Sequence, residues 1–240
     1  MISKTNAIVL SKIKYSDNDL IVKCYTEQFG VLNFLLKGVL KSKRGKVKTA
    51  YFQILSQLQL EITYQNNRTL QYIKEVKPHV IYSSIHTNIF KSAIAMFLGE
   101  VLSISLQEEE KNELLYAYLE TTLQWLDSQD EYSNFHLLFL LKLSRHLGFY
   151  PETNVINMPF FNLKSGSFEN QATNLYSISD ENLKLLKQLL GTTFEALPSI
   201  KINSKQRQSF LSMLLLYFEL HLGSFKKPKS LEVFNQVFNS

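Results

Sequence analysis

Polar and apolar residues alternate strictly along Gln57-Leu-Gln-Leu-Glu-Ile-Thr-Tyr64. A period of two places every second side chain on the same face of a β-strand, so this stretch predicts a strand with one buried face. Shorter apolar and β-branched runs lie on both sides of it, at Ala7–Leu10, Leu20–Tyr25, Val31–Leu36 and Thr69–Val76. Five short strands in succession predict a small β-barrel, because closure of the sheet removes its exposed edges.

After Pro78 the spacing of the apolar residues becomes helical. The predicted helices cover residues 85–101, 114–125, 135–147, 179–191, 204–222 and 230–238. Residues 151–178 contain Pro159, Gly166 and many Asn and Ser, which predicts an irregular loop or hairpin. The expected fold class is therefore α+β with two domains, a five-stranded barrel at 1–78 and an all-α helical domain at 79–240 that carries this irregular insertion.

The composition is that of a chain that buries a core, with 45% apolar and 20% charged residues. A single cysteine, Cys24, excludes an internal disulfide and any multi-cysteine metal site, and it fits a reducing compartment. The longest strongly apolar stretch, Phe210–Leu222, is too short to span a bilayer. We therefore expect a cytoplasmic protein.

The positive charge is concentrated in the first third of the chain. Residues 1–80 carry 13 Lys and Arg against 5 Asp and Glu, a net charge of +8, although the whole chain has a net charge of only +5. Residues 81–150 are acidic, with 4 cations and 9 acids. A basic segment beside a less basic remainder indicates a polyanionic partner, most commonly nucleic acid, with an anionic membrane surface as the alternative.

A basic run between the third and fourth predicted strands holds six cations in twelve residues, Lys37, Lys41, Lys43, Arg44, Lys46 and Lys48. We expect these cations to contact phosphates, and we expect two nearby aromatic residues, Tyr25 and Phe34, to stack on bases. Small barrels of the oligonucleotide-binding class combine a cationic groove with such rings. The alternative is a solvated loop, with Phe34 in the core rather than at the surface.

The motifs of common enzyme classes are missing from the sequence. A phosphate loop needs Gly-x4-Gly-Lys-Ser/Thr, but Gly38 and Gly45 are seven residues apart and Val47 follows Lys46. The five histidines form no recognisable ligand pair, and no Gly-x-Ser-x-Gly elbow occurs. Cys24 lies in an apolar strand, which favours an inert core thiol. We therefore expect a protein that is not an enzyme, with no catalytic and no metal-binding residues.

Several short segments, taken in order along the chain, carry a resemblance to a known family. They are Ala7-Ile-Val-Leu10, Tyr15-Ser-Asp-Asn-Asp19, Thr26-Glu-Gln-Phe-Gly30, Lys37-Gly38, Arg145-His-Leu-Gly-Phe-Tyr-Pro-Glu152 and Ser230-Leu-Glu-Val-Phe234. With them the chain resembles the bacterial DNA repair and recombination mediator family RecO. The resemblance implies an N-terminal OB-fold and a C-terminal helical domain. It also implies binding of single- and double-stranded DNA, annealing of complementary strands and loading of recombinase on coated single strands, close to the nucleoid.

One feature of the family is not matched. Many members carry a four-cysteine zinc knuckle after the segment that corresponds to Gly148–Glu152, whereas residues 153–177 contain no cysteine. Zinc needs about four thiolate or imidazole ligands, so we expect neither zinc nor another cofactor. A small apolar core is expected to replace the metal, built from Phe160, Phe161, Leu163, Phe168, Leu175 and Tyr176.

The partners that the resemblance implies are RecR and the acidic, Phe-ending tail of single-stranded DNA-binding protein. Such a tail needs an apolar pocket for its ring and cations at the rim. We expect it around the end of the predicted helix 135–147, at Lys142, Arg145 and Phe149. A second place lies beside the apolar run 210–222, at Lys205, Arg207, Lys226, Lys227 and Lys229. Two alternatives remain: these cations complement helix C-termini, or the whole protein is a basic-faced protein–protein adaptor without direct DNA binding.

Overall fold

The computed structural model describes residues 2–41, 47–106 and 110–239. The chain forms two compact units. The first, named the sheet unit here, comprises Met1–Ser128 and Pro228–Val237, and the second, the helical unit, comprises Gln129–Lys227 and Phe238–Ser240. The sheet unit therefore includes three helical segments that we expected in the helical domain.

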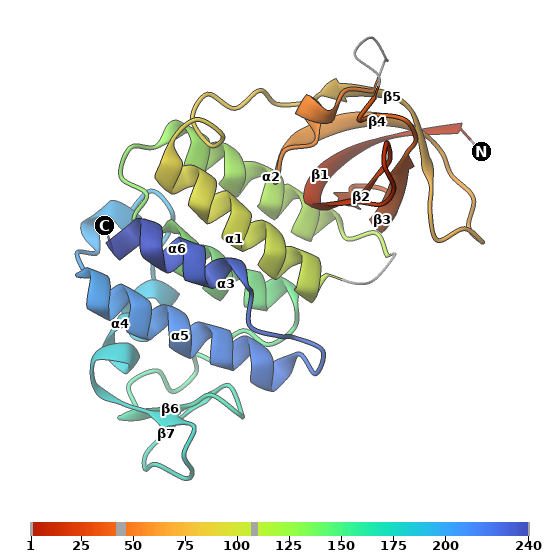
Figure 1. The fold of residues 1–240 in the computed structure, drawn as a ribbon. Coiled ribbons are helices and arrows are strands. Elements are labelled where there is room, and N and C mark those ends of the chain that lie inside the picture. The colour runs from red at the N-terminus through yellow and green to blue at the C-terminus, as the bar shows by residue number, and fades with distance from the viewer. Residues whose placement is uncertain (1, 42–46, 107–109, 240) are drawn as a thin grey trace. The chain divides into compact units, whose positions relative to one another are not determined.

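The sheet unit contains a five-stranded antiparallel sheet, as the alternation of apolar residues predicts (Figure 1). In the order in which they pair, its strands are β3 (Gly30–Leu36), β2 (Leu20–Thr26), β1 (Ile2–Lys14), β4 (Gln57–Thr63) and β5 (Tyr72–Pro78). All five predicted strands are confirmed, but β1 is much longer than Ala7–Leu10. Its first half pairs with β4 and its second half pairs with β2, and a register shift between Val9 and Ser11 separates the two.

The sheet is not a closed barrel, so this part of the prediction is wrong. Strands β3 and β5 are its edges, and among the described residues they approach each other through one isolated parallel bridge, Phe34–Gln71. The Gln71 side chain donates to the carbonyl oxygens of Gln65 and Arg68, at 2.8 and 2.9 Å, and so braces the loop that precedes β5. A braced loop therefore lies at the seam where closure would need a continuous ladder of hydrogen bonds.

The inner face of the sheet buries a core of aliphatic and aromatic side chains. Its members include Ala7, Val9, Val22, Cys24, Phe34, Phe52, Leu58, Leu60 and Ile62. The opposite, outer face packs against two helices, α1 (Ile89–Ser105) and α2 (Glu113–Ser128). Gly99 permits this packing on α1, because a Cβ at this position would lie 3.1 Å from the carbonyl oxygen of Leu10.

The last helix of the chain, α6 (Ser230–Asn239), belongs to the sheet unit up to Val237. The Glu100 carboxylate of α1 accepts hydrogen bonds from the N–H groups of Lys229 and Ser230, at 2.9 and 2.8 Å, and so caps the start of α6. The Phe234 ring packs on Phe97, with centroids 5.0 Å apart. In Figure 1, α6 accordingly runs alongside α1.

The helical unit packs three helices together, α3 (Phe135–His146), α4 (Asp180–Leu190) and α5 (Ser204–His221). Gly148 takes a φ of +85° just past α3, as expected of a residue that ends a helix. Asn203 and Gln206 form a capping box that starts α5. None of the helices within the described ranges has the length and hydropathy that a bilayer crossing requires.

The irregular insertion of the helical unit is a small three-stranded sheet. Its strands are β6 (Phe160–Asn162), β7 (Ser167–Glu169) and β8 (Ser177–Ile178), with β6 in the middle. Phe161, Leu163 and Phe168 are buried, and the Phe161 ring contacts Tyr217 of α5 at 5.9 Å between centroids. The predicted apolar core is confirmed for these residues, but Leu175 is 84% exposed and takes no part in it.

Asp127, at the end of α2, holds the segment that joins β5 to α1. Its carboxylate accepts hydrogen bonds from the N–H groups of Ser83, Ser84 and Ile85 at 2.8–2.9 Å. Burial alone would raise the pKa of Asp127, but these hydrogen bonds outweigh it and lower the pKa to about 2.

We predict that Asp127→Ala lowers the free energy of unfolding by about 2 kcal/mol at neutral pH, because three N–H groups lose a charged acceptor. The folded pKa lies below the ordinary value of 3.8, so the contribution is complete above about pH 4 and is lost as the pH falls toward about 2. Urea unfolding of both proteins across this range measures it. A difference between them that does not shrink in acid would contradict the assignment.

Candidate nucleic-acid interface

Two cations flank a partly exposed aromatic ring at the seam between β3 and β5. Lys37 Nζ lies 5.5 Å and Arg68 Cζ lies 5.8 Å from the centre of the Tyr72 ring. Lys37 follows β3, Arg68 lies in the loop between β4 and β5, and Tyr72 is the first residue of β5. These three residues, named the Tyr72 cluster here, offer an aromatic face beside two positive charges, which is the combination that binds single-stranded nucleic acid.

The turn between β1 and β2 is fixed against the start of the basic run. Gly38 N–H donates to Asp19 Oδ1 at 2.8 Å, and Leu40 N–H donates to the Asn18 carbonyl oxygen at 3.0 Å. Gly38 has a φ of +65°, which a residue with a side chain rarely adopts. Lys37 and Lys41 are therefore presented from a defined backbone turn.

The predicted phosphate-binding cations lie partly within the described residues. Three cations of the basic run, Lys37, Lys41 and Lys48, are described and exposed. Lys43, Arg44 and Lys46 lie outside the described residues, so their contribution stays a prediction.

The stacking role expected for Tyr25 and Phe34 disagrees with their positions. Phe34 is fully buried in the core of the sheet. Tyr25 is buried on the outer face, where its ring stacks on Tyr116 of α2 with centroids 6.2 Å apart. Burial raises the pKa of Tyr25 to about 12. Neither ring offers a face to a base, because the inner core encloses one and α2 covers the other.

Arg68 and Tyr72 were not among the residues predicted from the sequence. The signal that points to them is their place in the fold, because OB-folds bind ligands through the loop between strands 4 and 5 and through the strand 2–3 face. Arg68 lies in that loop, and Tyr72 begins the strand after it.

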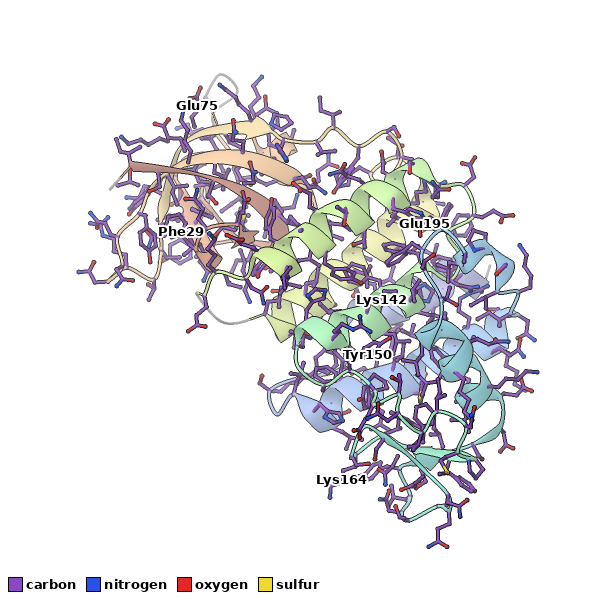
Figure 2. All side chains as sticks on the ribbon, turned by 180° about the vertical axis from the view of Figure 1, so that it is seen from behind. Phe29, Glu75, Lys142, Tyr150, Lys164 and Glu195 are labelled. Atoms are coloured by element: carbon purple, nitrogen blue, oxygen red, sulfur yellow. The ribbon has the colours of Figure 1, made fainter. Side chains whose placement is uncertain are left out.

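The site predicted for an acidic tail, at the end of α3, has cations, but its Phe149 ring is not available to contact the aromatic ring of the tail. Figure 2 shows Lys142 on α3, with Tyr150 beyond the end of this helix. The Arg145 guanidinium lies 4.1 Å from the Tyr150 ring centre. Burial, and next the Arg145 charge, lower the pKa of Lys142. The Phe149 ring is buried, with its face stacked on His221 at 5.1 Å, so it is part of the core of the helical unit.

A groove between α4 and α5, of about 320 Å³, combines apolar and cationic residues. Leu185 and Ile202 line it together with Lys184, Lys201 and Lys205. Lys205 belongs to the second predicted place. Arg207 belongs to the same predicted place but makes other contacts. Its guanidinium donates to Asn134 Oδ1 at 3.1 Å and to the Ile202 carbonyl oxygen at 3.3 Å.

The insertion of the helical unit does not fit a zinc knuckle. Its central carboxylate, Glu169, accepts hydrogen bonds from Ser177 Oγ, Thr173 Oγ1 and Asn162 Nδ2. Burial would raise the pKa of Glu169, but these hydrogen bonds lower it. Within the described ranges, no three His, Cys, Asp or Glu side chains lie together in a way that could hold a metal ion. A network centred on one carboxylate thus ties β6, β7 and β8 together.

Two sequence models of one protein family match the chain. The model described as Recombination protein O N terminal matches residues 1–82, and the model described as Recombination protein O C terminal matches residues 86–232. The chain belongs to the recombination protein O, or RecO, family. The resemblance seen in the sequence is thereby confirmed, and the five antiparallel strands are those of the family's N-terminal OB-fold, although the sheet is not closed.

Relatives in this family match the chain from end to end. The DNA repair protein RecO of Christiangramia forsetii is 49% identical, and the match covers 99% of this chain and 100% of the relative. The proteins of the same name from Flavobacterium johnsoniae and Bacteroides fragilis are 43% and 37% identical. Those matches cover 98% and 100% of this chain, and 99% and 100% of the relatives.

We predict that this RecO family member folds its insertion without zinc. Elemental analysis after dialysis should find far less than one zinc per chain, and a chelator should leave the melting temperature unchanged. Phe161→Ala should instead lower the free energy of unfolding by about 3 kcal/mol, because the side chain is buried in the apolar core of the insertion. Stoichiometric zinc, or a large loss of thermal stability on chelation, would contradict the prediction.

Proposed function

We propose that the protein acts in DNA repair and recombination as a non-enzymatic DNA-binding mediator. It binds single- and double-stranded DNA, anneals complementary strands and helps to load a recombinase on coated single strands. It does so in the cytoplasm, at the nucleoid. The observation that carries the proposal is the Tyr72 cluster, with its two cations beside an aromatic ring on a RecO-type OB-fold.

The cations of the interface are available for phosphates. Among the described residues, Lys37, Lys41, Lys48 and Arg68 have no carboxylate within ion-pair distance. An unpaired cation that meets a phosphate releases condensed counterions from the DNA, and this release is the main source of sequence-independent affinity. The same charges support annealing, because they reduce the repulsion between two strands held near one surface.

The partners that we propose are RecR and the acidic, Phe-ending tail of single-stranded DNA-binding protein. For the tail we favour the α4–α5 groove over the end of α3, because the Phe149 ring is buried whereas the groove has two apolar side chains, Leu185 and Ile202, beside three lysines. The lining acid, Glu181, accepts a hydrogen bond from Gln206 Nε2 at 3.0 Å, which partly satisfies its charge.

We predict that replacing Lys37 and Arg68 together by Ala weakens binding of single-stranded DNA of any sequence. Two lost phosphate contacts should make the slope of log affinity against log salt shallower by about 1.4. Fluorescence anisotropy with a labelled oligonucleotide over a salt series measures both quantities. Lys164→Ala is the matched control, because Lys164 is an exposed lysine at the β6–β7 hairpin of the helical unit (Figure 2).

An unchanged affinity in the double variant would reject the Tyr72 cluster as the interface. If the wild-type protein does not bind naked oligonucleotides at moderate salt, the alternative function, a protein–protein adaptor without direct DNA binding, takes its place. A strand-annealing assay with the same variants then connects DNA binding to the mediator activity.

We predict that Lys184→Ala with Lys205→Ala weakens binding of an acidic peptide that ends in Phe, because both cations line the α4–α5 groove. The loss should be about tenfold if each cation contributes one charge-assisted contact. Binding of naked single-stranded DNA should not change. If Lys142→Ala and Arg145→Ala weaken the peptide and the groove variants do not, the tail binds at the end of α3 instead.

A further inference from the structure

A short basic segment joins α5 to α6 (Figure 1). Its sequence is Lys226-Lys-Pro-Lys229, and no acidic residue occurs between Glu219 and Glu232. All three lysines are exposed. Four consecutive residues span at most about 14 Å, so chain connectivity alone keeps the three ammonium groups in one small region. These four residues are named the α5–α6 segment here.

Buried residues fix the backbone of the α5–α6 segment. Before it, Phe225 is 4% exposed, and its ring packs on Phe218 of α5 with centroids 5.6 Å apart. Within it, Pro228 is buried, and the proline ring restricts the backbone further. At its end, the Lys229 N–H group donates to Glu100 at 2.9 Å. The lysines therefore project from an ordered stretch of backbone, which reduces the conformational entropy that a ligand must overcome on binding.

Carboxylates do not neutralise the three ammonium groups. In the part of the chain that the structure describes, none of them lies within ion-pair distance of an acid. The carboxylate of Glu100 is engaged by the backbone N–H groups of Lys229 and Ser230. Burial would raise the pKa of Glu100, but the hydrogen bonds from Ser230 and Lys229 outweigh it and lower the pKa. Glu100 thus holds the start of α6, and the lysine side chains are available to an external anion.

The α5–α6 segment fits a chain of phosphates better than an acidic tail that ends in Phe. Such a tail needs an apolar pocket for its ring, and the neighbouring apolar residues, Phe225 and Pro228, are already buried in the fold. A lysine ammonium group is a compact point charge that binds phosphate without a fixed orientation. Three such charges close together match a nucleic-acid backbone, which carries one negative charge per nucleotide.

We propose that the α5–α6 segment is a second phosphate-binding site, which holds a further DNA strand while the Tyr72 cluster holds the first. The proposal rests on the proposed DNA-binding function and deepens it, because annealing brings two strands to one protein. A strand at the Tyr72 cluster occupies Lys37 and Arg68 with its own phosphates, so these cations do not offset the charge of a second strand. The three lysines of the α5–α6 segment supply that charge. Phosphate contacts carry no sequence information, so the second site accepts strands of any sequence.

The test measures capture of a second strand by a protein that already holds one. An immobilised oligothymidylate is loaded with protein, and binding of a second, labelled oligothymidylate is measured over a salt series. Two such strands cannot pair, so capture reports a second site rather than annealing. With Lys226, Lys227 and Lys229 replaced together by Ala, loading on the first strand should stay within about twofold of the wild type, while capture of the second should fall about tenfold. The salt slope of capture should become shallower by about 2 for three lost contacts.

A charge-matched control replaces Lys77, Lys111 and Lys164 together by Ala. All three are exposed, and the first two lie within ion-pair distance of Glu75 and Glu113. The control removes the same net charge from the protein without touching the α5–α6 segment. It should therefore capture the second strand as the wild type does.

The outcomes separate this inference from the proposed function. Unchanged capture by the triple variant, or no capture by the wild type, rejects the second site and leaves the Tyr72 cluster untouched. Equal losses of the first and second strands overturn it as well, because the segment then belongs to a single interface. If the triple variant binds both strands normally but loses an acidic peptide that ends in Phe, the segment is a peptide site instead. The Lys37 and Arg68 variant tests the proposed function separately, through loss of the first strand.

Urea unfolding checks the fold of each variant. If the triple variant is destabilised, Lys226→Ala with Lys227→Ala gives the same comparison, because it leaves the residue that donates to Glu100 unchanged. Two lost contacts should then make the salt slope of capture shallower by about 1.4. An unchanged slope in this double variant would also reject the second site.

Discussion

Strand β1 is hydrogen bonded to two different neighbours along its length, and the sheet unit depends on this change of partner. Ile2–Ile8 pairs with β4, and Ala7–Lys14 pairs with β2. The extra residue at the register shift, Leu10, reverses the alternation of side chains between the faces. Ala7 and Val9 face the core, so an unbroken alternation would place Ile13 on the inner side as well. The bulge turns Ile13 to the outer face instead, where it pairs with Ile21.

The cations of the sheet differ in whether the fold already uses them. Lys23 of β2, on the outer face of the sheet, donates to the last carbonyl groups of α1, a favourable position for a positive charge at a helix C-terminus. Burial lowers the pKa of this amine, so Lys23 is tied to the fold rather than offered to a ligand. Lys37 and Arg68 lie at the seam, where both contact the Tyr72 ring, and neither forms an ion pair with a carboxylate of the described residues. We therefore expect a polyanion to bind at the seam between β3 and β5.

Periodicity in the sequence predicted the elements of the fold well and their surroundings poorly. The alternation from Gln57 to Tyr64 predicted β4, because it depends on one strand and one buried face. The burial of Tyr25 could not be read in the same way, since its cover is Tyr116, a residue of α2 far along the chain. The prediction of a closed barrel was wrong for a similar reason. The hydrogen bonds from Gln71 to Gln65 and Arg68, which brace the loop at the seam, leave no pattern in the sequence. The basic run can be recognised from composition alone. Tyr72 is a candidate site residue only in the folded chain, where Lys37 and Arg68 lie beside its ring.

Annealing, which belongs to the proposed function, is compatible with an interface whose charges lie at one seam. Cations that contact phosphates leave the pairing edges of the bases free, so a bound strand can still meet its complement. Such contacts weaken as salt rises, because fewer counterions are then released. The duplex keeps its phosphates, so the proposed interface would hold a single strand and the duplex product through the same contacts.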